Sequence, residues 1–512
     1  MKHFLTLGLL LLYLAFLKSS DYEEVPLLSS FSLQDIEERI EDSCFLVSTS
    51  TTNSTTLQLL RNMTGILKSD SDKVSIGVLV DDESFLTGKE GVFSYGKGDD
   101  LGDLALYPRR IGGRKCLLRP PVSRLKSQIY KGEGSLQSLL QFINTNCGTH
   151  RRLDGSLTKI GVAAKSILNN VYQVPKSDTE GNSTNGPLEI GAMCERIAMP
   201  SQEEFLNKYL FRSKPVIITD AIKHWPAIQK WTNEFLIAKY SNTDTRVAFA
   251  PSGEYEGCEK AENYEEFKTF KLPDEVKKQL PFPDLVVVRP AFMNIKFAKF
   301  MDLLEGRNSN LTKMSNISAY LEYTSIPSYF PELEQDIQEM PCAAGLLNRK
   351  HLNIWLSDGN TLGKLHFDPF ENFLCQISGK KQVILYEPHD NTRLYEAHIQ
   401  ESMLEYNHAH KEFRRKKLLD STSMVMSPVD ILKPDYERFP KFQGVRAMNC
   451  TINEGEVLFM PSFWWHEVQS YPSHINPRNL AVNFWYEPFF SKDYPCESCK
   501  LEVNPSYHHL LG

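Results

Sequence analysis

Two short segments of this chain carry side chains that can act together only if the fold brings them to one place. The first is His366-Phe367-Asp368, and the second is the run 460–466, which ends in His466, 100 positions after His366. On a β-strand, residues i and i+2 point to the same face. His366 and Asp368 are therefore predicted to project together, while Phe367 points into the opposite layer.

These three side chains form a possible ligand set. Two imidazoles and one carboxylate can cover one face of an octahedral Fe(II) ion and leave the other face open for a bidentate co-substrate and O2. A histidine and an aspartate at this spacing, without further support, more often form a surface pair. The neighbouring segments decide between the two interpretations.

The segment after Asp368 is predicted to form a hairpin over residues 371–388. Its first strand covers 372–377, Ser378-Gly379-Lys380 form the turn, and the return strand covers 381–386. Lys381 opens the return strand. Its cation would pair there with the distal carboxylate of 2-oxoglutarate.

The segments around His466 are also predicted to be strands. Residues 457–460 are apolar, and Pro461 ends their ladder because it has no N–H to donate. The last predicted strand, 480–486, carries one polar residue, Asn483. Its buried amide would need partners, which a bound carboxylate or a metal-bound water would supply.

Together these segments resemble the Jumonji-C (JmjC) family, and within it the small protein hydroxylases of the lysyl hydroxylase type. The matching text is LHFDPFENFLCQISGKK (365–381), GEVLFMPSFWWHEV (455–468) and AVNFWY (481–486), with KPVIITDAIKHWPAIQKW (214–231) and YLEYTSIPSYFPEL (320–333) upstream. The resemblance implies a mixed fold over residues 191–495. Its centre would be a double-stranded β-helix, a cupin-like jelly roll with helical additions.

The resemblance also implies roles for individual residues. They fall into three groups: His366, Asp368 and His466 for Fe(II); Tyr320 and Lys381 for the far carboxylate of 2-oxoglutarate; and Asn372 and Asn483 for its metal-chelating end. The family's hydroxylases often place Thr or Ser three residues before the first histidine, where this chain has Gly363. Either Thr361 reaches the site through a looser loop, or the affinity for the co-substrate is weaker.

Residues 1–20 are predicted to be a secretory signal peptide. A short basic start precedes an apolar stretch at 4–17, whereas a spanning helix needs about 20 apolar residues. Cleavage near Ser19 or Ser20 is expected. Lys18 makes that site imperfect, so an uncleaved membrane anchor stays open as the alternative.

Glycosylation sequons and cysteines fit the same compartment. The sequons start at Asn53, Asn62, Asn182, Asn310, Asn316 and Asn449. An even count of 10 cysteines permits disulfides in a secreted chain, although their connectivity cannot be deduced. A local disulfide is favoured for Cys496 and Cys499 over a redox pair or half of a zinc site. Cys375 is predicted to pack as a small apolar residue.

Residues 30–173 are predicted to form a separate α/β unit. Strands at 45–47 and 74–80 and a strand, turn and helix over 129–144 alternate as in an α/β layer. The text YKGEGSLQSLLQFINTNCGTHRRLDG (130–155) resembles a thioredoxin-like domain of the protein disulfide isomerase type. The loop 48–56, where that family keeps its Cys-x-x-Cys, has no cysteine, which excludes dithiol exchange there. A generic α/β domain is the alternative.

The remaining segments are a linker at 174–190, rich in Pro, Gly, Ser and Asn, and a tail at 496–512. The net charge of −7 argues against a broad nucleic-acid-binding surface. A basic run at 411–417 is predicted to be a solvated helix face, with contact to an acidic substrate or a processing site as alternatives. Trp464 and Trp465 are predicted to belong to the core or the pocket wall.

The sequence thus predicts a dioxygenase that uses Fe(II), 2-oxoglutarate and O2 to hydroxylate a protein side chain in the secretory pathway. The endoplasmic reticulum lumen or the extracellular space would be its location, with contact to a membrane only if the N-terminal segment is an anchor. The alternative is a catalytically impaired JmjC protein that binds client proteins. The specific substrate and the oligomeric state are not predicted.

Overall fold

The chain forms two compact units in the computed structural model. The described residues are 28–32, 35–36, 44–48, 54–70, 74–79, 104–107, 128–172, 188, 190–251, 253–264, 280–306, 317–407, 410, 412–492, 494–495 and 501–511. The division falls between Val162 and Ala163, inside helix α5 and earlier than the boundary at residue 173 expected from the sequence. The expected signal peptide lies outside the described residues, as does nearly all of the expected linker.

The N-terminal unit is a mixed sheet with helices. Its strands run in the order β1-β3-β2-β4-β5; β1 and β2 pair with β3 in parallel, and β4 is antiparallel to both neighbours. The bounds are β1 Ser29–Phe31, β2 Cys44–Ser48, β3 Val74–Leu79, β4 Leu104–Tyr107, β5 Gln128–Ile129, α3 Ser54–Ile66, η1 Lys68–Asp70, α4 Leu136–Cys147 and α5 Lys159–Asn169. The strands predicted at 45–47 and 74–80 and the helix after residue 135 are confirmed.

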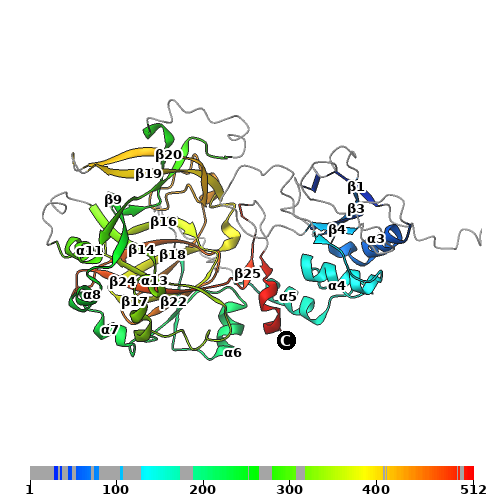
Figure 1. The fold of residues 1–512 in the computed structure, drawn as a ribbon, viewed down its shortest axis with the longest axis horizontal. Coiled ribbons are helices and arrows are strands. Elements are labelled where there is room, and N and C mark those ends of the chain that lie inside the picture. Colours follow the sequence, from blue (N-terminus) through cyan, green and yellow to red (C-terminus); the bar gives the residue numbers. More distant parts are fainter. Residues whose placement is uncertain are drawn as a thin grey trace, which may run out of the picture. The chain divides into compact units, whose positions relative to one another are not determined.

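Alternating side chains of this sheet supply two apolar clusters. Leu46 and Ile76 pack with Leu60 and Leu139 of helices α3 and α4, whereas Phe45 belongs to the other cluster. Figure 1 shows α3 and α4 beside this sheet, in blue and cyan. The sheet is therefore buried on both faces, as a strand set with continuous apolar runs requires.

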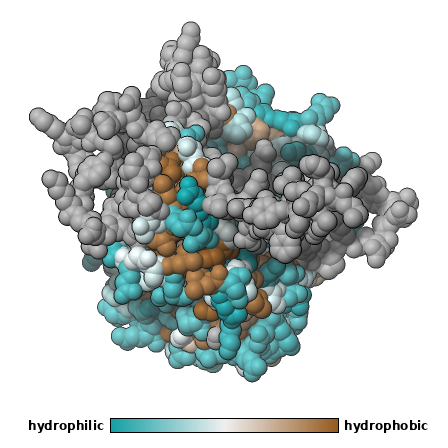
Figure 2. Space-filling model, turned by 90° about the vertical axis from the view of Figure 1, so that its right-hand side faces the viewer, coloured by the Kyte–Doolittle hydropathy of each residue, from teal (hydrophilic) through white to brown (hydrophobic). Residues whose placement is uncertain are grey.

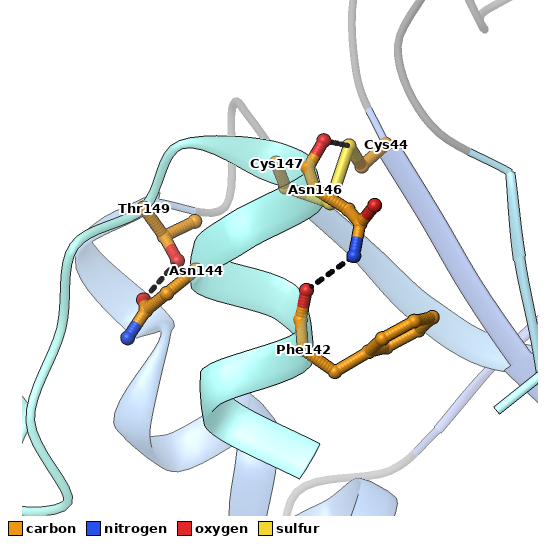
Figure 3. Close-up of a disulfide and its surroundings, with 6 residues drawn as sticks. All are labelled: Cys44, Phe142, Asn144, Asn146, Cys147 and Thr149. Atoms are coloured by element: carbon orange, nitrogen blue, oxygen red, sulfur yellow. Dashed lines mark hydrogen bonds between the residues drawn. A yellow bond between two sulfur atoms is a disulfide. The ribbon is translucent and has the colours of Figure 1, made fainter. Parts of the chain in front are cut away.

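A disulfide between Cys44 and Cys147 joins strand β2 to the end of helix α4. The two Cα atoms lie 6.0 Å apart. Figure 3 shows the bond beside the last turn of the helix, where Asn146 Nδ2 donates to the Phe142 carbonyl at 2.7 Å. The helix ends at Cys147, and the following Gly148, with a φ of 65°, caps its last turn. This pairing connects residues 103 positions apart, which the cysteine spacing alone did not reveal.

The second unit is built on two β-sheets. The larger sheet has the order β13-β9-β14-β15-β24-β17-β22-β8-β7, and the smaller sheet has the order β10-β16-β23-β18-β21-β6. The larger sheet comprises β7 Glu195–Ile197, β8 Val216–Ile218, β9 Asp244–Pro251, β13 Ala291–Lys296, β14 Ile317–Ser325, β15 Arg349–Ser357, β17 Glu371–Ser378, β22 Val457–Met460 and β24 Asn479–Tyr486. The smaller sheet comprises β6 Ile190–Met193, β10 Glu254–Tyr255, β16 Leu362–Phe367, β18 Lys380–Tyr386, β21 Ala447–Ile452 and β23 Trp465–Tyr471.

Shorter sheets and helices complete this unit. An accessory sheet has the order β11-β12-β19-β20, and β25 pairs with β26. The strand bounds are β11 Cys258–Lys260, β12 Leu285–Arg289, β19 Ala397–Asn407, β20 Glu412–Met426, β25 Phe490–Ser491 and β26 Glu502–Val503. The helices are α6 Gln202–Phe205, η4 Leu206–Leu210, α7 Pro226–Lys230, α8 Asn233–Tyr240, η5 Ala261–Asn263, α11 Phe297–Leu304, α13 Ile326–Tyr329, η6 Pro331–Asp336, η7 Pro388–Asp390, η8 Pro440–Phe442 and η9 Pro505–Leu511.

The inner faces of the two sheets enclose one apolar cluster. Leu374 of the larger sheet and Val383 and Leu385 of the smaller sheet belong to it. The adjacent residues Cys375 and Ile384 belong to the outer core, which helices α7, α8 and α11 cover. Figure 1 shows these helices beside strands β17, β14 and β9. Two facing sheets with alternating inward residues are consistent with the predicted jelly roll.

Strands β17 and β18 correct the predicted hairpin. Both strands lie where the sequence predicted them, but β17 pairs with β22 and β24 in the larger sheet, and β18 pairs with β21 and β23 in the smaller sheet. The turn at Gly379, with φ of 82°, therefore passes the chain from one sheet to the other. Local pattern predicts a strand but not its partner, because pairing depends on distant residues.

The basic run at 411–417 was predicted to be a helix face, and this was wrong. Its described residues begin strand β20, which pairs with β19. Arg415 forms an ion pair with Glu259 of β11, and Arg414 pairs with Glu412. Strand pairing with β19 outweighs the helix propensity of charged residues here.

A second disulfide, Cys194–Cys450, ties the start of this unit to strand β21, with Cα atoms 4.9 Å apart. Cys375 is fully buried, as predicted, and so are Trp464 and Trp465. Cys496 and Cys499 lie outside the described residues. Within the described ranges no helix is long and apolar enough to cross a membrane. Figure 2 shows apolar areas among hydrophilic ones on one face, a mixture common on protein surfaces.

Candidate functional site

Strands β16 and β23 bring the two predicted ligand segments together. They pair antiparallel in the smaller sheet with His366 opposite His466, after an irregularity that follows Gly363. Asp368 comes directly after β16, and its carbonyl accepts a hydrogen bond from Phe463 N at 2.9 Å. One ligand atom from each of His366, Asp368 and His466 lies within 4.8 Å of the others. The fold thus assembles the three side chains that the spacing suggested.

Backbone carbonyls fix both imidazole rings. His366 Nδ1 lies 2.7 Å from the Lys364 carbonyl, and His466 Nδ1 lies 2.9 Å from the Trp464 carbonyl. A carbonyl oxygen only accepts hydrogen bonds, so each Nδ1 carries the proton. Each Nε2 then keeps its lone pair for a metal ion.

Burial and neighbouring side chains favour the metal-binding protonation states of His366 and Asp368. Burial and the neighbouring His466 lower the pKa of His366, which keeps that ring neutral. Burial acts to raise the pKa of Asp368, but its contact with His466 and the nearby His366 together hold that pKa below the ordinary value. A neutral imidazole and an ionised carboxylate are the states that bind metal ions.

A pocket lies in front of the three ligands, between the two sheets. Its empty volume, the mouth included, is about 690 Å³. Every residue that the sequence suggested for the site lines it: Tyr320, Thr361, His366, Asp368, Asn372, Lys381, His466 and Asn483. Gly363 lines it as well. Strands of both sheets supply these side chains, so the pocket exists only in the folded chain.

One part of the pocket carries a buried lysine. Lys381 Nζ lies 2.7 Å from Ser470 Oγ and 5.9 Å from the centre of the Tyr320 ring. Thr361 is buried, and its hydroxyl donates to Ser470 Oγ at 2.9 Å. Thr361 therefore reaches the site, one of the two possibilities left open by Gly363.

The two predicted asparagines face each other across strands β17 and β24. Asn483 Nδ2 lies 3.4 Å from Asn372 Oδ1, and Asn483 Oδ1 accepts from Trp355 Nε1 at 2.8 Å. Protein groups therefore already satisfy part of the Asn483 amide. A bound ligand is not needed to explain its burial, contrary to the argument from sequence.

The other part of the pocket is acidic and aromatic, and it was not predicted from the sequence. An irregularity of strand β14 between Leu321 and Thr324 places consecutive residues, Glu322 and Tyr323, on the same pocket. Tyr323 has a φ of 49°, which fits such a bulge. The pKa of Glu322 is raised to about 8, mainly by burial and secondly by repulsion from Glu256. No regular strand pattern predicts two adjacent side chains on one face.

Glu256 forms the rest of this acidic part. Its carboxylate lines the pocket and pairs with Arg289 at 2.9 Å, while Arg289 itself is not part of the lining. The side chain of Glu322 forms no hydrogen bond or ion pair with any other described residue. Both glutamates thus line the pocket, whereas Arg289 and Arg246, the cations that act against the rise in the pKa of Glu322, are not part of its lining.

The three ligands fit Fe(II). Two imidazole nitrogens and one carboxylate oxygen, on a buried wall with open space beside them, match the donor set of a non-haem iron centre. No other described group of histidine, cysteine and carboxylate side chains lies close enough together to hold a metal ion.

The unit that holds this pocket matches a known protein family and several characterised proteins. A family model described as a cupin-like domain matches residues 201–492. A human protein named bifunctional peptidase and (3S)-lysyl hydroxylase JMJD7 is 27% identical over 321 residues, which cover 60% of this chain and 90% of the relative. Lysine-specific demethylase JMJ32 of Arabidopsis thaliana is 27% identical, covering 60% and 85%. Lysine-specific demethylase 8 of Xenopus tropicalis is 26% identical, covering 58% and 54%.

Proposed function

Because this chain belongs to the cupin-like family, we propose that it carries a JmjC-type domain and is an Fe(II)- and 2-oxoglutarate-dependent dioxygenase that hydroxylates a protein side chain. The observation that carries the proposal is the cluster of His366, Asp368 and His466 on the wall of a pocket that also holds the buried Lys381. The names of the relatives, a hydroxylase and demethylases, support the same reaction class.

His366, Asp368 and His466 would hold the iron, and Lys381 with Tyr320 would hold the distal carboxylate of 2-oxoglutarate. When bound, Fe(II) supplies the oxidising chemistry that couples decarboxylation of 2-oxoglutarate to hydroxylation of a C–H bond. The contribution of the chain is to orient its ligands and to limit water. The carbonyls of Lys364 and Trp464 fix the imidazole rings, and the apolar Leu374 and Met460 line the pocket beside them.

The acidic part of the pocket supports a basic substrate side chain, as in the hydroxylase relative whose name specifies lysine. Glu256 and Glu322 would attract an ammonium group, and Tyr323 and Trp355 would contact its aliphatic stem and its charge. The rings of Tyr323 and Trp355 lie 4.6 Å apart at this wall.

For the location we propose the secretory pathway, in the endoplasmic reticulum lumen or outside the cell. The apolar N-terminal segment, the sequons and the two disulfides, Cys44–Cys147 and Cys194–Cys450, support it, since disulfides persist in oxidising compartments. Glycosidase treatment and fractionation of the full chain test it. A glycosidase-resistant protein in the cytosol would refute the location.

For the N-terminal unit we propose a thioredoxin-like domain without redox activity. Its strand order and the pairing of parallel and antiparallel strands support that fold, and the missing Cys-x-x-Cys supports a role in binding or positioning. A client-binding protein with an impaired barrel is the other function that the sequence suggested. The position of Thr361, which lines the pocket despite Gly363, argues against impairment.

Turnover of the co-substrate tests the proposed reaction. The purified protein, loaded anaerobically with Fe(II) and then exposed to O2, should convert 2-oxoglutarate to succinate, and His366→Ala should abolish the conversion. His474→Ala, which changes an exposed histidine outside the pocket, is the matched control and should retain it. Absence of both binding and turnover of 2-oxoglutarate in the unmodified protein would refute the enzyme proposal.

A further inference from the structure

Lys381 is a basic side chain in an unusual position. Its side chain is 2% exposed, and its nitrogen contacts one hydroxyl, Ser470 Oγ at 2.7 Å. No carboxylate of the described residues lies within ion-pair distance of it, although the same pocket holds Glu256 and Glu322 elsewhere. A buried ammonium without a counter-ion is strongly disfavoured.

The groups around Lys381 are all uncharged at neutral pH. From the elements packed against strand β18 these are Ile452 of β21, Ser470 of β23, Thr361 before β16, Tyr320 of β14, and Asn372 and Asn483 of the opposite sheet. Burial raises the pKa of Tyr320, so its hydroxyl stays neutral. Burial lowers the pKa of Lys381 to about 7, and no neighbouring charge opposes it. Ligand-free Lys381 is therefore poised between amine and ammonium.

Ser470 suits both forms of this side chain. It lies directly opposite Lys381 in the β18–β23 pairing, is fully buried, and also accepts from Thr361 at 2.9 Å. A hydroxyl can accept from an ammonium or donate to the lone pair of a neutral amine. A carboxylate at this position would keep the lysine charged permanently and would repel an anionic ligand.

We propose that Ser470 is a positioning residue for Lys381, and that Lys381 takes up a proton from solvent when the distal carboxylate of 2-oxoglutarate binds beside it. The uptake converts a neutral amine into an ammonium that pairs with the carboxylate, and no other bond changes. This inference rests on the proposed function, because it assumes that 2-oxoglutarate is the ligand. It makes co-substrate binding dependent on pH in a range where most carboxylate-binding cations stay charged.

Calorimetry measures the proton directly. The whole protein is loaded with Mn(II), which replaces iron without turnover, and 2-oxoglutarate is titrated in two buffers of different ionisation enthalpy, HEPES and Tris. Lys381→Arg is the reference, because a guanidinium stays protonated throughout. Relative to this variant, the unmodified protein should take up about one proton per ligand near pH 8 and almost none near pH 6.

The Ser470 variants test the positioning role. Ser470→Ala should shift the midpoint of the uptake curve to lower pH, because the ammonium loses a stronger hydrogen bond than the amine does. Ser470→Thr should restore the midpoint. A midpoint unchanged in Ser470→Ala would overturn the role of Ser470, and equal uptake in the unmodified protein and Lys381→Arg would overturn proton coupling while 2-oxoglutarate binding stands. Absence of 2-oxoglutarate binding would overturn the proposed function as well.

Discussion

The ion pair between Lys492 and Glu396 gives the most quantitative prediction. Both side chains are fully buried, with Lys492 Nζ 2.9 Å from Glu396 Oε2. Lys492 also lies over the rings of Phe367 and Trp465, each adjacent in sequence to a predicted iron ligand. Lys492→Met keeps the shape of the side chain and leaves a carboxylate buried without its counter-ion, which is strongly destabilising.

In Lys492→Met, Glu396 can take up a proton and so avoid a buried unpaired charge. This limits how much stability the variant loses. Burial raises the pKa of Glu396 even with Lys492 present. Protonating a carboxyl of ordinary pKa, about 4.3, costs about 1.36 kcal/mol per pH unit above that value. The penalty in Lys492→Met is therefore limited to about 3.7 kcal/mol near pH 7 and about 1 kcal/mol near pH 5.

The sign of the pH dependence is fixed. In Lys492→Met the pKa of Glu396 in the folded protein lies above that in the unfolded chain. The folded state therefore binds the proton more tightly, and stability falls as pH rises above the unfolded value. Urea unfolding followed by tryptophan fluorescence, at several pH values, measures this loss relative to the unmodified protein.

The double variant Lys492→Met with Glu396→Leu is the matched control. It removes both charges and should lie within about 1.5 kcal/mol of the unmodified protein, because an apolar pair of similar volume can replace a buried ion pair. A single variant that is no less stable than the double variant, or a penalty that does not grow with pH, would refute the reasoning.

Three further predictions concern the pocket and the disulfide. Mn(II) at about 100 times its dissociation constant should raise the free energy of unfolding of the unmodified protein by about 2.7 kcal/mol in thermal unfolding. It should not stabilise His366→Ala. Equal stabilisation of both proteins would show that the metal binds elsewhere. Glu322→Gln should weaken the binding of peptides with a central lysine about tenfold, measured by fluorescence anisotropy. The control Glu254→Gln changes an exposed glutamate near the site and should leave the affinity unchanged. Equal affinities of the two variants would show that Glu322 does not recognise the substrate. Cys194→Ser together with Cys450→Ser should lower the free energy of unfolding by about 2–4 kcal/mol in urea, and an unchanged midpoint would contradict a structural disulfide.

The strands of the barrel could be predicted from local pattern, because apolar runs bounded by glycine and proline specify extended structure. Residues 457–460 and 480–486 became strands β22 and β24 with nearly the predicted bounds. Their partners could not be predicted in the same way. The predicted hairpin at 371–388 instead connects two sheets, because each strand finds its hydrogen-bond partners more than 60 residues away.

The predicted site residues all line one pocket, since the residue types and their order were informative. Ser470 and Glu322 were not predicted, and the reasons differ. Ser470 is an ordinary serine until strand pairing sets it opposite Lys381. Glu322 lies two residues after Tyr320, so alternation puts it on the same face, but nothing in the sequence marked its carboxylate as part of the site. Only its neighbour Tyr323 needs the bulge of strand β14 to line the pocket.

The sequence by itself determined the kinds of atoms available for chemistry: two imidazoles, one carboxylate and one lysine, on segments whose alternation makes them strands. Only the tertiary structure decided their distances, their protonation and their surroundings. His366 and His466 meet because β16 and β23 pair, and Lys381 has an unusual pKa because the fold buries it without an anion. Composition and spacing are local properties of the chain, whereas burial and the electric field at a side chain depend on every element packed around it.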